Sequence, residues 1–330
     1  MLDAVNQVAN DLGILPEWVR QIVENASNNY KLLKIPKRSS GGSGSGVRIV
    51  YQPAVETKMI QHWVTRSLLA KLPVSRMATG FEAGTSILKN AQFHRKSRYS
   101  TRIDLEDFFQ SIRVRDLIAT ITRNAARVPA WALEPASSDL IAKVCFLSDG
   151  RLPVGFPSSP RIANVVMHPI DEALLGLLNS NSAIFGAARL TRYADDFVFS
   201  TDRKGACTEF HHALERLLRG TKSPSLRINE AKTKKMSRTS GSTLITGLRV
   251  KPTGEIGVHA NYRDRVRLLL KLFSEGRLRM EERSQLKGHL TFVRYADAAL
   301  FTRLSFRFHK EIATLMRGDE PAGTVVKAAA

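Results

Sequence analysis

Two adjacent aspartates inside an otherwise apolar stretch constrain this chain more than any other feature. Asp195 and Asp196 follow Tyr193-Ala194, and the apolar run Phe197–Phe199 comes directly after them. This pattern predicts a strand, a tight turn and a second strand, with both acids at the turn. An isolated Asp-Asp pair would also suit an ordinary polar turn, so the rest of the chain has to decide between a turn and a catalytic site.

A third acid ends another apolar strand. Asp104 lies in the predicted strand 101–105 and is followed by Phe108 and Phe109. Side chains at the ends of neighbouring strands can converge on one point. Phosphoryl transfer from a nucleoside triphosphate needs such convergence, because two divalent cations about 3.5–4 Å apart hold the reacting oxygens. We expect Asp104 and Asp195 to bridge two Mg²⁺ ions, with Mn²⁺ as an alternative, and Asp196 to support them.

The net charge of the 330-residue chain favours a polyanionic partner. Lysine and arginine number 50 against 30 acids, which gives +20 and a pI near 10.3. Nucleic acid and an acidic membrane surface both fit this charge. No apolar run is long enough to span a bilayer, and Met1–Ala4 lacks the features of a signal peptide. We therefore expect a cytoplasmic protein bound to nucleic acid, with Cys145 and Cys207 as reduced core thiols.

The N-terminal part of the chain predicts two short helices and a hairpin. Residues 2–28 give the helices, which suit either a small packing element or a helix-turn-helix that reads DNA. Tyr30–Ile35 and Val47–Tyr51 have strand composition and flank a Gly/Ser stretch. We interpret them as a hairpin with a mobile basic tip at Lys37 and Arg38, with an engineered linker as the alternative.

Further along, periodicity predicts several helices and strands. The helices are 54–72, 138–147, 160–178 with a kink or break at Pro169, 208–219, and the region from Tyr262 onward. Leu244–Val250 and Gly257–His259 are expected to be strands. In the last helical region Val266, Leu269, Leu270 and Phe273 share an apolar face. Arg263, Arg267 and Lys271 form a basic ridge that we expect to meet nucleic-acid phosphates.

The order of these segments resembles the polymerase motifs of reverse transcriptases. Tyr193–Asp196 resembles motif C, and Ile103–Phe109 resembles motif A. Leu152–Asn164 resembles motif B, Ile228–Thr233 resembles motif D, and Arg48–Pro53 resembles the fingers segment that contacts incoming nucleotide. Their shared order and spacing is a more specific signal than any one motif.

Two further segments resemble signatures of the retron type of reverse transcriptase. Asn90–His94 is similar to the Asn-Ala-x-x-His signature, and Ile245–Leu248 to the Val-Thr-Gly signature. The resemblance implies an α+β, right-hand polymerase fold with an antiparallel palm sheet. It divides the chain into N-terminal helices and fingers (1–100), a palm (101–250) with a helical insertion at about 117–150, and a helical thumb (251–330).

The resemblance also implies roles for individual residues around the incoming nucleotide. Arg48 would grip the triphosphate, and Phe109 would select the deoxyribose. Gly155 would allow a close backbone approach to the nucleotide or the template base, and Tyr193 would pack near the primer end. Lys232 would lie near the leaving pyrophosphate as a charge stabiliser or a proton donor, although Lys234 and Lys235 crowd the same segment.

The remaining implied roles concern the metal ions and the RNA. Leu105 joins the metal-site residues, and Asn90, His94, Thr246 and Gly247 are associated with a dedicated structured RNA. One departure is Val154, where the family usually has Gln. A glutamine there can form a hydrogen bond or stack near the nucleotide sugar, and valine cannot. The properties that this departure concerns are nucleotide affinity and fidelity.

These features predict an RNA-directed DNA polymerase that uses dNTPs. By resemblance it makes RNA-linked single-stranded DNA (msDNA) on a cognate non-coding RNA, alongside a separate effector protein in defence against phage. Multimers of the nucleoprotein are a further option. Two alternatives stay open: another class, such as a group II intron-like or abortive-infection reverse transcriptase, and a nucleic-acid-binding scaffold without catalysis. The presence of all three acids argues against the scaffold.

Overall fold

The computed structural model describes residues 4–36 and 46–317, and it divides into two compact units. The first comprises residues 1–84 and 101–235, and the second comprises 85–100 and 236–330. The expected basic tip at Lys37 and Arg38 lies outside the described residues. Within the described ranges no helix is long and apolar enough to cross a membrane.

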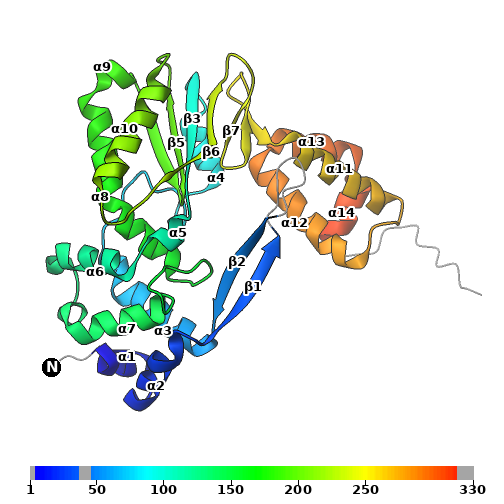
Figure 1. Cartoon of the computed structure of the whole chain (residues 1–330). Helices are drawn as coiled ribbons and strands as arrows, with labels where there is room; N and C mark the ends of the chain where they lie inside the picture. Colours follow the sequence, from blue (N-terminus) through cyan, green and yellow to red (C-terminus); the bar gives the residue numbers. More distant parts are fainter. Residues whose placement is uncertain (1–3, 37–45, 318–330) are drawn as a thin grey trace, which may run out of the picture. The chain divides into compact units, whose positions relative to one another are not determined.

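The first unit contains a helical region and a sheet (Figure 1). Its helices α1, α2, α3, α6 and α7 contact one another, and α10 packs on β5. Their bounds are α1 Ala4–Leu12, α2 Pro16–Ala26, α3 Val55–Ser67, η1 Leu69–Lys71, α5 Phe108–Ser111, α6 Val114–Arg123, η2 Ala125–Arg127, η3 Ala130–Leu133, α7 Pro135–Cys145, α8 Ser159–Ser180, α9 Ser182–Phe185 and α10 Ala206–Gly220.

The sheet of this unit has four strands in the order β4-β5-β3-β6. These strands are β3 Tyr99–Leu105, β4 Arg189–Tyr193, β5 Asp196–Thr201 and β6 Ile228–Ser237. β4 and β5 pair antiparallel, with Leu190 opposite Phe199. Phe197, Val198 and Phe199 are all buried, and Phe199 stacks on Phe210 of α10 at 4.4 Å. Apolar side chains on both faces therefore hold the β4–β5 hairpin in the core.

The predicted N-terminal hairpin is present as β1 Tyr30–Pro36 and β2 Val47–Pro53, which pair antiparallel with Ile35 opposite Arg48. Most of its side chains are exposed, in contrast to the central sheet. The two predicted N-terminal helices are also confirmed. Gly13 ends α1 with a φ of +66°, and Pro16 opens α2, where its missing N–H costs no helical hydrogen bond.

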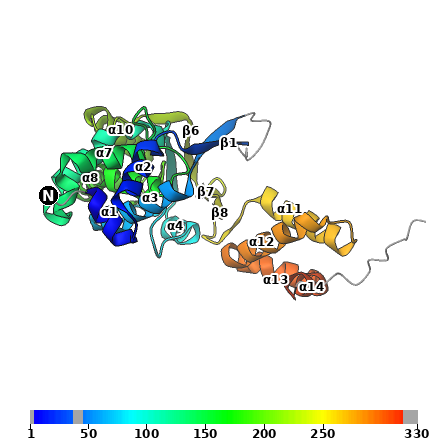
Figure 2. The same cartoon turned by 90° about the horizontal axis from the view of Figure 1, so that it is seen from below.

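The second unit combines a small sheet with a group of helices. α4 Ile87–His94 packs on the three-stranded sheet β7 Thr243–Ile245, β8 Leu248–Val250 and β9 Ile256–Val258. The last helices contact one another (Figure 2): α11 Ala260–Ser274, α12 Met280–Ala296, α13 Ala298–Arg307 and α14 His309–Arg317. The expected apolar face of α11 is buried, from Val266 to Phe273. Buried leucines of α12 and α13 give these helices a core of their own.

Two expectations about secondary structure were wrong, and a third was wrong in part. Leu244–Val250 is not one strand, because Thr246 and Gly247 have φ of +45° and +83° and turn the chain between β7 and β8. Two consecutive positive φ values are the signature of a tight hairpin turn. The helix predicted over 54–72 ends at Ser67, and a 3-10 turn follows. α8 continues across Pro169, so the predicted alternative of a break is wrong, and the alternative of a kink stays a prediction.

Candidate active site

The β4–β5 hairpin places both adjacent aspartates at or beside a two-residue turn. Tyr193 and Asp196 face each other across β4 and β5, and Ala194 and Asp195 connect them. Ala194 has a φ of +55°, a left-handed conformation that non-glycine residues adopt at a cost and that is common at functional sites. The Leu105 amide donates to the Asp195 carbonyl at 3.1 Å. This bond fastens the turn to the end of β3, where Asp104 lies.

Burial and neighbouring carboxylates raise the pKa values of two of the three acids, Asp195 and Asp196. Burial is the main cause of the raised pKa of Asp195, and the charge of Asp104 adds to it. Burial also raises the pKa of Asp196 to about 6. Asp195 and Asp104 reinforce this shift, and Arg102 opposes it. A site that resists the ionisation of its own acids gains from any cation that neutralises them.

Basic side chains meet two of the three acids. The Lys232 ammonium lies 2.9 Å from Asp104 Oδ1, and Arg102 Nε lies 3.5 Å from Asp196 Oδ1. The second contact is too long to be a good hydrogen bond, and both atoms are buried without a hydrogen-bond partner. Lys232 comes from β6 and Asp104 from β3, which are neighbours in the sheet. The segment that resembles motif D therefore reaches the carboxylates directly.

The carboxylate oxygens of these acids fit a hard divalent cation, although the acids do not already form a closed set of metal ligands. In the described part of the chain no three His, Cys, Asp or Glu side chains stand together as a metal site. Lys232 accounts for this at Asp104, where its ammonium already neutralises a carboxylate oxygen. Asp196 Oδ1 lacks a hydrogen bond and remains a buried acceptor. Carboxylate oxygens that repel one another are the ligands that Mg²⁺ and Mn²⁺ prefer.

The β1–β2 hairpin approaches the segment that resembles motif B. The Tyr51 amide donates to the Val154 carbonyl at 2.8 Å. A Cβ on Gly155 would lie 2.5 Å from the Tyr51 carbonyl oxygen, and Gly155 has a φ of +110°. The close approach that requires glycine here is therefore to β2. Arg48 is exposed on β2, and its charge lowers the pKa of Asp195, so the guanidinium lies within electrostatic reach of the acids.

Three aromatic rings lie beside the catalytic turn. Phe109 is partly exposed, whereas Phe108 is buried in the core. The Phe81 ring is 6.5 Å from Phe109 and 6.1 Å from Tyr193. Phe81 is half-exposed with a φ of +64°, and a Cβ on the adjacent Gly80 would lie 2.8 Å from the Ala194 amide nitrogen. The contact of Gly80 and Phe81 with the turn was not predicted from the sequence.

A buried arginine behind the turn was also missed. Arg192 is 0% exposed and pairs with Asp171 of α8. Its remaining nitrogen, Nη1, donates to the Asn164 side chain at 3.2 Å and to the Ala194 carbonyl at 3.1 Å. Asn164 in turn donates to the Gly80 carbonyl at 2.9 Å, so it orients the turn and does not cap α8. The signal in the sequence was weak, because Arg192 is one of two arginines in the short strand Arg189–Tyr193.

The comparisons with known proteins agree with this site. Residues 35–263 match the family described as reverse transcriptase (RNA-dependent DNA polymerase). The chain is 36% identical over 270 residues to the retron Ec73 reverse transcriptase of Escherichia coli, which covers 81% of this chain and 84% of that protein. The chain belongs to the retron reverse transcriptases. The retron Ec83 reverse transcriptase of the same organism is 26% identical and covers 89% of this chain and 91% of its own length.

A solved structure of telomerase from Candida albicans, in complex with a fragment of telomeric RNA, supports the fold. It is 12% identical with a TM-score of 0.50 and covers 91% of this chain. The chain spans 56% of that telomerase chain. This likeness and the family match confirm the α+β, right-hand polymerase fold. The enzyme is an RNA-directed DNA polymerase with template RNA and dNTPs as substrates, and its family uses divalent metal ions.

The residues that the resemblance associates with RNA lie in the second unit of this reverse transcriptase. Asn90 and His94 share the buried face of α4 and are 1% and 2% exposed. Thr246 Oγ1 donates to the Ile87 carbonyl at 3.2 Å, which joins the β7–β8 turn to the start of α4. Gly247 is exposed beside it. The two signatures therefore meet in one structural element, where buried side chains support an exposed turn.

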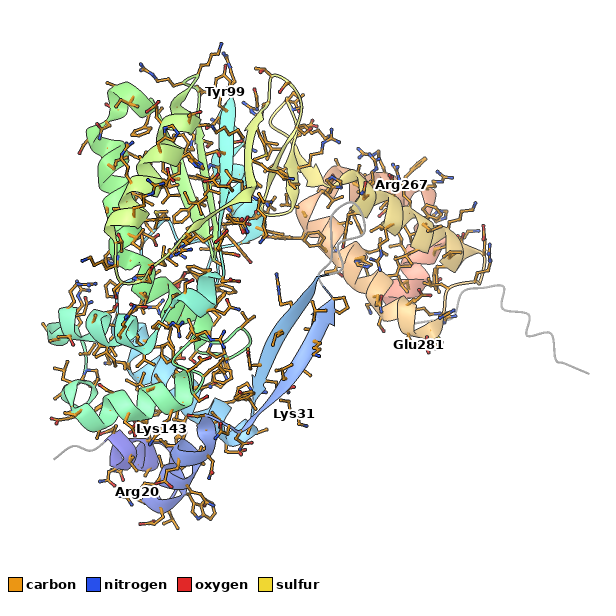
Figure 3. All side chains as sticks on the ribbon, in the orientation of Figure 1. Arg20, Lys31, Tyr99, Lys143, Arg267 and Glu281 are labelled. Carbon is orange, nitrogen blue, oxygen red and sulfur yellow. The ribbon has the colours of Figure 1, made fainter. Side chains whose placement is uncertain are left out.

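The basic ridge of α11 is partly neutralised. Arg263 Nε lies 2.9 Å from Asp264, and Arg267 Nη1 lies 3.4 Å from the same carboxylate. Lys271 lies 3.8 Å from Glu275. These exposed pairs contribute little to stability, so the basic groups can exchange their partners for other anions. Arg267 is labelled in Figure 3.

Proposed function

We propose that this reverse transcriptase makes msDNA on a cognate structured non-coding RNA by two-metal phosphoryl transfer, as part of an anti-phage defence system. The observation that carries the proposal is the group formed by Asp104 and Asp195, which the Leu105–Asp195 hydrogen bond joins, and in which burial and the charge of Asp104 raise the pKa of Asp195. The family match and the retron relatives support the polymerase part. The msDNA product is proposed from the relatives, whose names describe retron enzymes.

In this proposal Asp104, Asp195 and the Leu105 backbone would hold two Mg²⁺ ions, with Mn²⁺ as a substitute and Asp196 in support. Such ions polarise the phosphoryl oxygens and stabilise the attacking and leaving oxygens. Lys232 and a divalent cation would compete for Asp104, because the ammonium already lies at 2.9 Å. Once displaced, Lys232 would be free to stabilise the negative charge of the leaving pyrophosphate.

The other residues of the site would bind and select the nucleotide. Arg48 would pair with the triphosphate, which suits an exposed guanidinium whose charge already reaches Asp195. Phe109 would occupy the space of a ribose 2′-hydroxyl, and Tyr193 would pack near the primer end. Gly155 and Val154 would shape the nucleotide side of the pocket through their fixed contact with β2. The fingers, palm and thumb division at 1–100, 101–250 and 251–330 belongs to the same proposal.

RNA recognition would use the second unit. Thr246 and Gly247 would present an exposed turn to the RNA, while Asn90 and His94 would act through the helix that supports this turn. Arg263, Arg267 and Lys271 would contact phosphates without reading sequence. A separate effector protein would complete the defence system, and several nucleoprotein units could assemble into a larger particle.

The experiment that tests this proposal is purification from the native locus, followed by gel analysis of the bound nucleic acid with and without RNase. DNA that shortens after RNase treatment is the expected result. It should be absent from the Asp195→Asn/Asp196→Asn variant and present in the matched control Asp139→Asn, a surface acid in α7 that pairs with Lys143. RNA alone, or random cellular nucleic acid, would contradict the msDNA proposal. Proteins that copurify, and the elution volume of the particle, test the effector and the assembly.

A further inference from the structure

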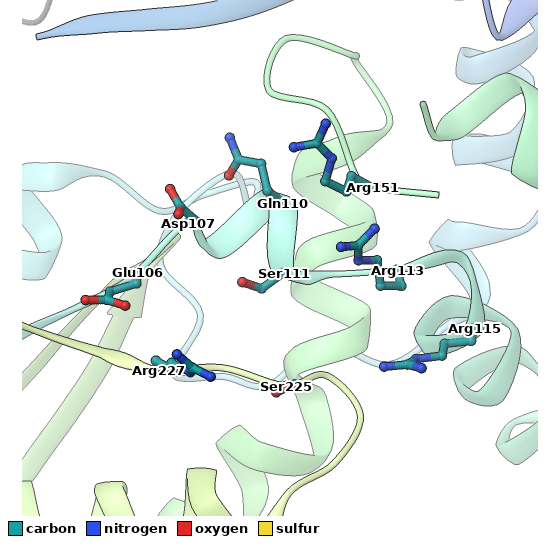
Figure 4. Close-up of a pocket in the computed structure, with 9 residues that line it drawn as sticks. All are labelled: Glu106, Asp107, Gln110, Ser111, Arg113, Arg115, Arg151, Ser225 and Arg227. Atoms are coloured by element: carbon teal, nitrogen blue, oxygen red, sulfur yellow. The ribbon is translucent and has the colours of Figure 1, made fainter. Parts of the chain in front are cut away.

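A polar cavity of about 460 Å³ lies at the end of α5, just beyond the strand that carries Asp104. Its lining includes Ser111, Arg113, Arg115, Ser225 and Arg227. Figure 4 shows Arg115 extending toward Ser225, with Arg113 and Arg227 on other sides of the same space. With Arg151, four guanidinium groups and two hydroxyls therefore surround one cavity, and none of these residues has been given a role in nucleotide binding above.

Backbone contacts hold the walls of this cavity, although they come from three distant parts of the chain. The Glu106 amide donates to the Arg227 carbonyl at 2.9 Å, so the start of β6 is fastened to the segment after Asp104. Arg113 and Arg151 face each other as an isolated antiparallel bridge. The Arg113 amide also donates to the buried Asp116 carboxylate at 2.7 Å. The arginine side chains thus project from backbone that is already ordered.

The charge of the cavity is not fully compensated by the protein. Asp149 neutralises Arg151 through contacts of 2.7 and 2.5 Å. Arg113 donates to the Asp149 backbone carbonyl at 3.0 Å, and its charge lowers the pKa of the Asp149 carboxyl less than the contacts with Arg151 do. The Arg227 side chain has no hydrogen bond or ion pair within residues 4–36 and 46–317.

Two acids also line the cavity, and one further acid lies near Arg115. Glu106 and Asp107 are exposed, and in Figure 4 they lie on the side remote from Arg115. Arg115 Nε is 3.9 Å from Asp116, at the limit of an ion pair. Asp116 is buried and already accepts a hydrogen bond from Ser223, so it neutralises the charge of Arg115 only weakly. The two acids thus lie toward Arg227, and the four arginines that line the cavity outnumber them.

We propose that this cavity binds a phosphate group. Guanidinium forks match the geometry of phosphate oxygens, and serine hydroxyls supply further donors. The phosphate has two chemical sources in a polymerase reaction. One is the backbone of a nucleic-acid strand that passes the palm, and the other is free pyrophosphate released beside Asp104. The inference does not depend on msDNA synthesis or on RNA priming.

Binding measurements on the full-length protein test the inference without any DNA synthesis. Arg227→Gln is the main variant, because its side chain makes no contact whose loss would unfold the protein; Arg113→Gln is the second. Arg123→Gln, an exposed arginine of α6, is the matched control. Inorganic pyrophosphate is titrated by calorimetry, and oligouridylate binding is followed by fluorescence anisotropy over a range of KCl concentrations.

Each source of phosphate has its own expected result. If the cavity takes free pyrophosphate, Arg227→Gln weakens its binding by about tenfold or more, which corresponds to ~1.4 kcal/mol, while RNA binding is unchanged. If it takes a strand, RNA affinity falls and the slope of log K against log salt decreases by about one. The inference is overturned if Arg227→Gln matches Arg123→Gln in both measurements. A failure of Arg113→Gln to fold would leave this decision to Arg227→Gln.

Discussion

Arg192 pairs with Asp171 through two hydrogen bonds, Nε to Oδ1 at 2.8 Å and Nη2 to Oδ2 at 2.7 Å, and neither side chain is exposed to solvent. The same guanidinium donates to the carbonyl of Ala194 in the catalytic turn. The pair therefore connects α8 to the backbone that carries Asp195. Its geometry combines a structural role with a positioning role, and substitutions can separate the two.

Arg192→Met should leave the Asp171 carboxylate buried without a partner. We expect the free energy of unfolding to fall by about 3–5 kcal/mol, as for other broken buried pairs. The double variant Arg192→Met/Asp171→Leu removes both charges and should recover most of this loss. Because the Ala194 carbonyl still lacks its donor, we expect kcat for DNA synthesis to stay low while KM for dNTP changes little. Urea unfolding and steady-state kinetics measure these quantities. A double variant with wild-type kcat would show that the pair is structural only.

Asp196 should make the metal-free protein less stable as pH rises. Its pKa is raised by burial to about 6 from the ordinary 3.8, so the unfolded chain loses this proton at lower pH than the folded chain. The free energy of unfolding should therefore fall between about pH 4 and pH 6 and stay low above that window, by on the order of 2 kcal/mol. Asp196→Asn should remove this loss and be more stable than the wild type near neutral pH without metal.

Urea unfolding near pH 4 and near pH 7 checks the Asp196 prediction. The variant and the wild type should have similar stability at the lower pH. Added MgCl₂ should stabilise the wild type near neutral pH and have a smaller effect on the variant, because one acceptor has lost its charge. A wild type that becomes more stable from pH 4 to pH 6, relative to Asp196→Asn, would contradict the assigned direction of the pKa shift.

The central hairpin could be predicted because the information lies in adjacent residues. Apolar residues on both sides of Tyr193–Asp196 define the strands, and the acids define the turn. The pairing of Arg192 with Asp171 lies beyond such reasoning, since the two residues are 21 positions apart on a strand and a helix. Nothing in the spacing of a single sequence indicates which of many acids meets a buried arginine.

Turn conformations and close backbone contacts are likewise only partly predictable from the sequence. Thr246 takes a positive φ although threonine is β-branched and rarely adopts it, so local preference favoured a continuous strand over 244–250. Gly155 was predicted to allow a close approach, and the structure identifies its neighbour as Tyr51 of β2. The glycine at position 155 indicated that a close contact exists, whereas only the tertiary fold shows that the contact is with Tyr51.

Phe109 offers a test of nucleotide selection. Its ring is fixed by edge contacts with Phe108 at 5.3 Å and Phe81 at 6.5 Å, so it cannot easily turn away from a ribose hydroxyl. Phe109→Ala should raise the incorporation of rNTP relative to dNTP by about tenfold or more, or ~1.4 kcal/mol in the transition state. Primer extension with each nucleotide type measures the ratio, and Phe306→Ala, a solvent-exposed ring of α13, is the control. An unchanged ratio would assign Phe109 to packing alone.

Val154 offers a test of nucleotide affinity. Its carbonyl accepts the Tyr51 amide through the backbone, so a new side chain at this position leaves the contact with β2 intact. Val154→Gln adds a side-chain amide that can donate to the nucleotide sugar, and one such hydrogen bond contributes about 0.5–1.5 kcal/mol. We therefore expect KM for dNTP to fall by about two- to tenfold, with kcat nearly constant. Steady-state primer extension at varied dNTP concentration measures both parameters. Unchanged kinetics would mean that the Val154 side chain does not face the nucleotide, and that the departure from the family pattern has no effect on nucleotide binding.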